Sequence, residues 1–283
     1  MIAFSAPLVK LAEVSPSTAA VFRCAYALPL LGLLAWLERS RHGPADPGDR
    51  RLALLAGFFF AADLTFWHHS IEAVGAGLAT VLGNAQVVLV GLLAWALLHE
   101  RPERSSVLAV PLAMIGVVLI SGVVGSGAYG DDPLLGVVFG LLTALTYAFF
   151  LLVLRRAGGD RRRPAGPLFD ATSAAAVFAL VGGLAVGDFD PVPGPESQAW
   201  LVTLALSSQV LGWLLISFAL PRAPAVITSI VLTIQPVGSI ILGAIIFSEA
   251  PSPFQLLGVA LILSGVVTAT ARAAPSPSAA EVG

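Results

Sequence analysis

Charged residues are scarce in this chain of 283 residues, since Asp, Glu, Lys and Arg together make up 11% of it. A soluble domain carries about 25%. Hydrophobic residues account for 57%, and the mean hydropathy is +0.90. Too few charges remain to solvate a globular surface, which excludes a water-soluble enzyme, a disordered chain and a nucleic-acid-binding protein. The composition therefore predicts a protein of the lipid bilayer.

Cysteine and catalytic signatures are also lacking. The single cysteine, Cys24, excludes an intrachain disulfide and a cysteine-rich metal site. The chain has no HExxH motif and no phosphate-binding loop, so ATP does not drive it directly. The stretch 185–188, which ends in Asp188, departs from the GxGD pattern of membrane aspartyl proteases at its first position. We expect no enzyme activity, no cofactor and no bound metal.

Long apolar runs, in contrast, are abundant. A helix needs roughly 20 apolar residues to cross the hydrocarbon core of a membrane. Nine runs approach that length: Thr18–Leu37, Leu52–Ser70, Gly75–Leu98, Val107–Val124, Leu134–Leu154, Leu168–Val186, Gln198–Leu220, Pro224–Phe247 and Phe254–Ala271. A tenth, Met1–Ala12, is short, and we expect it to be a helix whose earlier half is missing. The runs are continuous rather than alternating, which favours helices over barrel strands.

The basic residues predict the orientation of these helices. With the N-terminus in the cytoplasm, 13 of the 15 Lys and Arg residues fall in loops on the cytoplasmic side. The opposite loops carry acidic residues and no Arg: Glu13, Glu72, Asp131, Asp132, Asp188, Asp190, Glu196 and Glu249. The positive-inside rule then predicts ten crossings with both termini cytoplasmic. We expect a multi-pass protein of a bacterial-type cytoplasmic (inner) membrane.

The two halves of the sequence repeat each other. A shift of 149 residues aligns 76–118 with 225–267 without gaps, with 12 of 43 positions identical. The identities include Gln86 with Gln235 and Glu100 with Glu249. Five helices per half is an odd number, so the second repeat enters the membrane upside down. The predicted units are a first repeat over 1–124, a connecting loop over 125–133, a second repeat over 134–272 and a disordered cytoplasmic tail over 273–283.

Each repeat resembles a known carrier family. Residues 66–122 and 214–270 each contain a long helix that ends in Glu (Glu100, Glu249) and then a Gly-bearing apolar helix (Gly116, Gly265). This pattern, with Arg23 and the stretch 233–237, is similar to EamA-type transporters of the drug/metabolite transporter superfamily. The resemblance implies a transport fold but no particular substrate. The first repeat departs from the family at Val87, where a proline is usual.

Two charges lie inside predicted spans. A charge at the membrane centre costs about 2.5–3.5 kcal/mol on insertion scales, so both must be compensated. Asp63 falls near the midplane, where it is a candidate for binding a proton or a substrate ammonium, or for a structural pairing with Arg23 or a helix dipole. We expect Arg23, nearer the helix end, to be a structural charge paired with Glu13 or a carbonyl; binding of a substrate carboxylate is the alternative.

Polar and aromatic residues at similar depth complete the predicted cavity. Pro236 breaks its helix beside Gln235, and broken helices at the midplane line protein or a wet cavity. His68 is a candidate for gaining and losing a proton. Alternatively, the Trp residues belong to the aromatic belt at the membrane interface. The Asn and Gln side chains would then simply form hydrogen bonds between helices. The predicted cavity residues are Asp63, Trp67, His68, Asn84, Gln86, Tyr147, Gln209, Trp213, Thr233 and Gln235.

These features predict a secondary transporter that moves a small organic solute by alternating access. The expected solute is amino-acid-like, an amine or drug-like, and the expected direction is export. Proton exchange at Asp63 is a hypothesis; the first alternative is an uncoupled facilitator or exchanger of the same fold. A distant alternative is an integral-membrane enzyme for lipid-linked substrates, for which His99, Glu100 and Glu103 form a sparse acidic cluster. The expected partners are the solute and the lipid bilayer.

Overall fold

The computed structural model describes residues 2–86, 89, 93, 104–125, 127–158, 160, 162–219 and 225–271. Side chains are not described for residues 2, 104–108, 217–219, 225–234 and 269–271. The side chain of Thr233, the residues His99, Glu100 and Glu103, and the tail 273–283 therefore lie outside the description. So does Val87.

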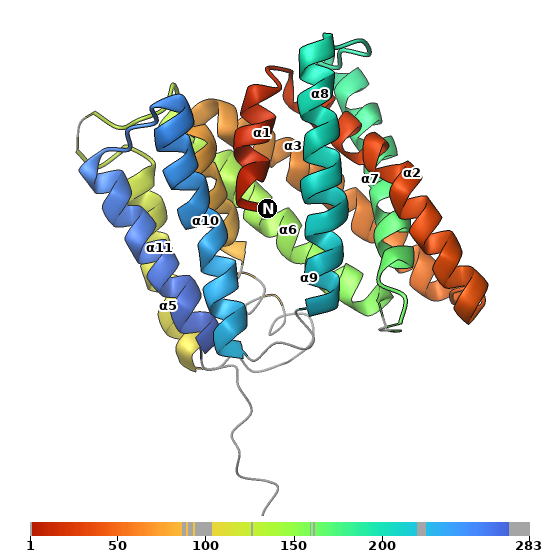
Figure 1. Cartoon of the computed structure of the whole chain (residues 1–283). Helices are drawn as coiled ribbons and strands as arrows, with labels where there is room; N and C mark the ends of the chain where they lie inside the picture. Colours follow the sequence, from red (N-terminus) through yellow and green to blue (C-terminus); the bar gives the residue numbers. More distant parts are fainter. Residues whose placement is uncertain are drawn as a thin grey trace, which may run out of the picture.

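The described chain is helical throughout and contains no strand (Figure 1). Its elements are η1 (Ile2–Phe4), α1 (Ser5–Leu11), α2 (Pro16–His42), α3 (Pro47–Asn84), α5 (Arg104–Ile120), α6 (Pro133–Ala157), α7 (Ala165–Val186), α8 (Pro195–Leu204), η2 (Ala205–Gly212), α9 (Trp213–Ala219), α10 (Ala225–Phe247) and α11 (Pro253–Ala271). Five stretches are long and apolar enough to cross a membrane: Pro16–His42, Pro47–Asn84, Pro133–Ala157, Ala165–Val186 and Pro195–Ile216. Shorter apolar stretches lie at Ala109–Ile120, Gln235–Phe247 and Pro253–Thr268.

Helix starts follow local capping chemistry. Asp46 precedes Pro47, and its side chain accepts a hydrogen bond from the Gly48 amide at 2.6 Å. Asp132 precedes Pro133 and caps the Leu135 amide at 3.0 Å. An acidic N-cap satisfies a free amide, and proline at the next position needs no amide partner. These caps extend the helices a few residues beyond the apolar runs.

Helix α3 contains a break at Gly75. The backbone there has φ 83° and ψ 167°, which is not helical, and a new helical segment starts at Ala76. This position separates two of the spans predicted from the sequence, 52–70 and 75–98. Glycine is required because this conformation is essentially closed to residues with a side chain.

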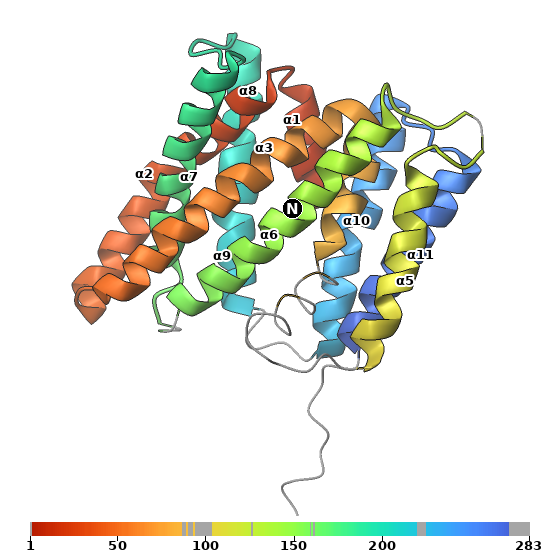
Figure 2. The same ribbon diagram turned by 180° about the vertical axis from the view of Figure 1, so that it is seen from behind.

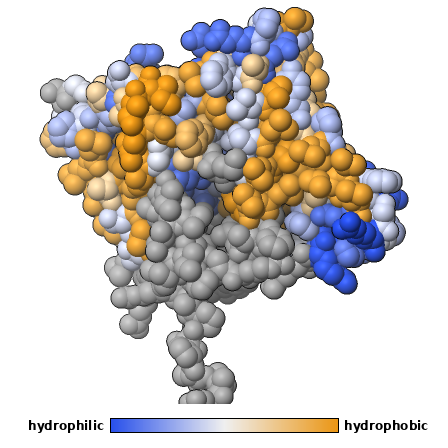
Figure 3. Space-filling model, in the orientation of Figure 1, coloured by the Kyte–Doolittle hydropathy of each residue, from blue (hydrophilic) through white to orange (hydrophobic). Residues whose placement is uncertain are grey.

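The helices pack as an elongated bundle. Helix α3 lies along α6, and α2 and α7 pack together on one side of the molecule (Figure 2). Helix α5 packs against α11 on the other side, with α10 between this pair and α3 (Figure 2). Apolar side chains form broad patches on either side of one face, while hydrophilic ones gather at its upper edge and lower right corner (Figure 3). This distribution matches a bundle surrounded by lipid, with polar ends in water.

Hydrogen bonds join the helix connections at each end of the bundle. At one end, the Tyr129 amide donates to Gln255 Oε1 at 2.8 Å, which ties the α5–α6 connection to α11. At the other end, the Ala165 amide donates to Glu38 Oε1 at 2.9 Å, which ties α7 to α2. Acidic residues predicted opposite the cytoplasmic side, such as Glu13, Glu72 and Asp131, lie at the first end. We call it the Glu249 end, after the residue between α10 and α11.

Candidate functional site

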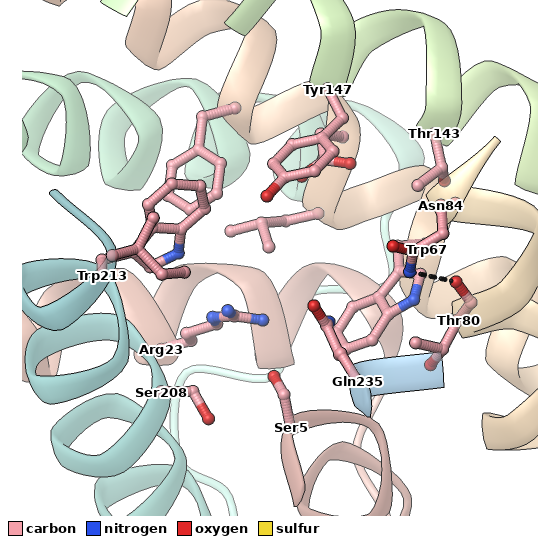
Figure 4. Close-up of a pocket in the computed structure, with 15 residues that line it drawn as sticks. Ser5, Arg23, Trp67, Thr80, Asn84, Thr143, Tyr147, Ser208, Trp213 and Gln235 are labelled. Carbon is pink, nitrogen blue, oxygen red and sulfur yellow. Dashed lines mark hydrogen bonds between the residues drawn. The ribbon is translucent and has the colours of Figure 1, made fainter. Parts of the chain in front are cut away.

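A cavity of about 70 Å³ lies among the central helices (Figure 4). Six of the predicted cavity residues line it: Asp63, Trp67, Asn84, Tyr147, Trp213 and Gln235. Arg23 lines it as well. Its other lining residues are not among the predicted cavity residues: Ser5, Phe60, Leu64, Thr80, Gly83, Thr143, Ser208 and Ile216.

Arg23 projects from α2 into the cavity, and the whole residue is 5% exposed. Its Nε donates to Gln209 Oε1 at 3.1 Å, and its guanidinium lies 5.7 Å from the centre of the Trp67 ring. The structure thus gives Arg23 an amide and an aromatic face, where the sequence predicted Glu13 or a carbonyl. Such contacts stabilise a guanidinium away from water.

Asp63 lies on α3 and is 7% exposed. No ion pair joins Asp63 to Arg23 in the described part of the chain, although both side chains line the cavity. The Trp213 ring packs edge-on against Phe60, with ring centres 5.9 Å apart, and against Tyr147 at 6.0 Å. The cavity therefore presents a guanidinium group and a separate carboxyl group between aromatic walls.

Several polar atoms of this cavity have no hydrogen-bond partner among the described residues. They are Arg23 Nη1, Ser5 Oγ, Thr143 Oγ1 and Ser208 Oγ. Buried polar atoms in folded proteins nearly always have a partner in protein, water or ligand. Four such atoms surround this one cavity.

Gln209 lies beside the cavity rather than on its wall. Its Oε1 accepts from Arg23, and its Nε2 donates to Thr172 Oγ1 at 3.2 Å. Residues Ala205–Gly212 form a π-helix, in which hydrogen bonds run from i to i+5 and the turn is wider than in an α-helix. Ser208 lines the cavity together with Trp213.

His68 belongs to a second cavity at the Glu249 end, of about 470 Å³, lined also by Lys10, Glu13, Glu72 and Asp131. His68 Nδ1 lies 3.0 Å from the carbonyl oxygen of Pro16. Because a carbonyl only accepts, this contact assigns the ring proton to Nδ1. The neighbouring Trp67 lines the central cavity, so adjacent residues of α3 face two cavities.

Gln86 and Pro236 lie near the central cavity without lining it. Gln86 is 4% exposed, and its Oε1 has no partner among the described residues. Pro236 is buried inside α10, next to Gln235, and α10 runs from Ala225 to Phe247 through it, so the predicted helix break is absent. The described His, Cys, Asp and Glu side chains form no group of three that could hold a metal ion.

Comparison with known proteins agrees with this architecture. A family model described as the EamA-like transporter family matches residues 1–122 and 134–271. The chain is 26% identical over 262 residues to "Uncharacterized transporter YxxF" of Bacillus subtilis, covering 91% of this chain and 82% of that one. It is 26% identical over 223 residues to an uncharacterized transporter of Archaeoglobus fulgidus, covering 78% and 76%.

A solved crystal structure shares the fold. Its TM-score with this chain is 0.60 at 16% sequence identity, and the match covers 95% of this chain and 93% of the other. The apolar helical bundle and the matching sequences together define a multi-pass membrane transporter. The chain belongs to the EamA-like transporter family, as its repeated helices had indicated.

Proposed function

We propose that this transporter is a secondary carrier for a small organic solute, working by alternating access. The observation that carries the proposal is the central cavity, where Arg23 and Asp63 offer opposite charges and four buried polar atoms lack partners. A solute with one carboxylate and one ammonium group would use both charges. The rings of Trp67, Tyr147 and Trp213 would contact its apolar part. An amino-acid-like solute therefore fits this lining best; an amine or a drug-like cation would use Asp63 and the rings.

The proposed architecture has ten crossings in two inverted repeats, over 1–124 and 134–272, joined by residues 125–133. The family model matches two separate stretches, which supports a duplication. Lining residues come from both halves, for example Asn84 from the first and Gln235 from the second. Inverted repeats that share a midplane site can expose it to each side in turn.

The proposed orientation places both termini in the cytoplasm of a bacterial-type inner membrane. The described basic loops support it, because Arg50, Arg155 and Arg163 all lie at the end opposite Glu249. Acidic residues such as Glu13 and Asp131 lie at the Glu249 end. Cysteine labelling from each side at the exposed positions 41 and 131 tests the orientation, which requires that they react from opposite sides.

Ligand binding tests the solute class. Purified protein would be heated with amino acids, amines, nucleosides or quaternary cations, since a ligand of the folded state raises the melting temperature. We expect Arg23→Gln to remove the rise in melting temperature with amino acids and to leave the rise with amines unchanged. Asp63→Asn should remove both. Arg41→Gln and Asp131→Asn, which change exposed residues, serve as controls. A wild-type response to amino acids in both cavity variants would refute the assignment.

Flux in liposomes tests coupling. We propose that Asp63 exchanges a proton against the solute, so a pH gradient should drive uptake by wild-type protein. Asp63→Asn should abolish gradient-driven flux, with Asp131→Asn as the control. If the Asp63→Asn protein kept full gradient-driven flux, the coupling role would be wrong. Wild-type flux that ignores the gradient would instead indicate a facilitator or exchanger.

A further inference from the structure

Glu249 is a buried carboxylate in the connection between α10 and α11. Its side chain is 3% exposed. Lys10 Nζ lies 2.9 Å from Oε1, the Ala76 amide donates to Oε1 at 2.8 Å, and the Gly77 amide donates to Oε2 at 3.1 Å. A buried carboxylate is costly unless charge and hydrogen bonds compensate it, and these three donors do so.

The local backbone is shaped around this carboxylate. The break at Gly75 frees the amides of Ala76 and Gly77, which start a new helical segment and carry its partial positive charge. At the end of α10, Ser248 has φ 55°, and the Glu249 amide donates back to the Gly243 carbonyl at 3.2 Å. A Cβ on Gly243 would lie 2.3 Å from Glu249 Oε2, so glycine makes room for the carboxylate.

The elements that Glu249 binds both reach the central cavity. Lys10 is in the last turn of α1, and Ser5 at the start of α1 lines the cavity. In the α3 segment, Thr80 Oγ1 donates to the Ala76 carbonyl at 2.7 Å, and Asn84 Nδ2 donates to the Thr80 carbonyl at 2.8 Å, a contact drawn in Figure 4. Thr80 and Asn84 line the cavity. Hydrogen bonds thus run from Glu249 to the cavity wall.

We propose that Glu249 is a positioning residue for transport: it fixes α1 and the 76–84 segment of α3 against the α10–α11 connection and so closes the central cavity toward the Glu249 end. This inference rests on the proposed carrier function. Glu249 belongs to the second half of the chain, whereas Lys10, Ala76 and Gly77 belong to the first. The contact must therefore separate when the halves move apart at this end.

Glu249 accepts from a side-chain ammonium, Lys10, and from two backbone amides, so substitutions at Glu249 and at Lys10 should affect closure unequally. Glu249→Gln removes the charge and turns an amide NH₂ group toward Lys10 or the backbone amides, which are also donors. Lys10→Gln removes the ion pair but leaves both backbone donors in place. The double exchange Lys10→Glu with Glu249→Lys restores opposite charges, yet it places an ammonium beside the amides of Ala76 and Gly77. It should not rescue closure.

Thiol labelling measures closure directly. The reporter is Ser5→Cys in a Cys24→Ala background, because Ser5 lines the cavity and its hydroxyl has no partner among the described residues. A membrane-impermeant thiol reagent is added from the Glu249 end to the full-length protein in liposomes, without solute. We expect Glu249→Gln to raise the labelling rate about tenfold. Lys10→Gln should raise it less. The control Glu196→Gln, at an exposed position outside the cavity that Lys10 lines, should leave it unchanged.

The outcomes separate this inference from the proposed function. Wild-type labelling rates in Glu249→Gln would overturn the closing role. If that variant does not fold, Lys10→Gln carries the test, since the Lys10 side chain is 32% exposed; a rate equal to wild type overturns the role there. Rescue by the double exchange would refute the contribution of the backbone amides. Failure of the carrier function would appear separately, as absence of flux and of ligand-induced stabilisation in the wild-type protein.

Discussion

Gly116 of α5 and Gly258 of α11 approach each other reciprocally. A Cβ on Gly116 would lie 2.6 Å from the Gly258 carbonyl oxygen, and a Cβ on Gly258 would lie 2.6 Å from the Gly116 carbonyl oxygen. The sequence repeat maps these positions onto Gly265 and Ala109, and a Cβ on Gly265 would lie 3.2 Å from the Ala109 carbonyl oxygen. Such a paired set of contacts is what a two-fold relation between the repeats would produce, and it supports the proposed inversion.

The crossing of α5 and α11 should therefore be sensitive to a single methyl group. Small residues allow close helix packing in membranes, and overpacking costs about 1–3 kcal/mol. We expect Gly116→Ala and Gly258→Ala each to lower the melting temperature of the purified protein. Gly182→Ala is the matched control, because a Cβ there meets nothing within 4 Å. Equal melting temperatures for all three variants would contradict the close crossing.

The sequence predicted the helical class and the positions of most described helices, because long apolar runs and charged loops are local features. It also placed Asp63, Trp67 and Asn84 together with Tyr147 and Trp213, through depth in the membrane and helical spacing. The sequence did not identify Ser5 and Thr80 as cavity residues, because serine and threonine are common within membrane helices. Their role depends on how distant helices pack.

Two features could not be derived from spacing along the chain. Gln209 was assigned to the cavity by an α-helical face, but residues 205–212 form a π-helix, and the Gln209 side chain bonds to Arg23 and Thr172 beside the cavity. Glu249 was expected in an outer loop, and its burial depends on donors from Lys10 and Ala76, far away in the sequence. Long-range contacts of this kind have no periodic signature.

Gln209 should orient Arg23. Replacement by Met keeps the side-chain length but removes the acceptor for Arg23 Nε and the donor to Thr172. Loss of a hydrogen bond to a buried charged group costs about 1.5–3 kcal/mol, so the melting temperature should fall. Relative to wild type, we also expect Gln209→Met to reduce the rise in melting temperature with amino acids more than the rise with amines. Gln198→Met, at a partly buried position near the start of α8, is the control; similar responses in both variants would exclude the orienting role.

The stability of the α6–α7 connection should depend on pH because of Asp160. Hydrogen bonds from the Arg162 amide and side chain lower the pKa of this carboxyl, and Arg163 also pairs with it. A lowered pKa means that the stabilisation is present at neutral pH and is lost as pH falls through the pKa of the folded state. Hydrogen exchange of residues 157–166 should be faster in Asp160→Asn than in wild type at pH 7. The two proteins should converge at strongly acidic pH; a difference that persists there would contradict this origin.

Gly75 and Gly43 allow backbone strain to be separated from the contact with Glu249. Their dihedral angles are similar, with φ 83° and ψ 167° at Gly75 and φ 82° and ψ −173° at Gly43. A Cβ on Gly75 would lie 2.7 Å from Glu249 Oε1, whereas a Cβ on Gly43 would meet nothing within 4 Å. Backbone strain of this kind costs about 1–3 kcal/mol, so both alanine variants should lose stability.

Gly75→Ala should have a second effect that Gly43→Ala does not share. Its methyl group would displace the Glu249 carboxylate from the amides of Ala76 and Gly77. We therefore expect faster labelling of the Ser5→Cys reporter from the Glu249 end in Gly75→Ala, and wild-type labelling in Gly43→Ala. Melting temperatures measured on the same samples report the shared strain. If the two variants lost similar stability and labelled at the same rate, glycine at position 75 would be needed only for its backbone conformation. Its contact with Glu249 would then have no part in closure.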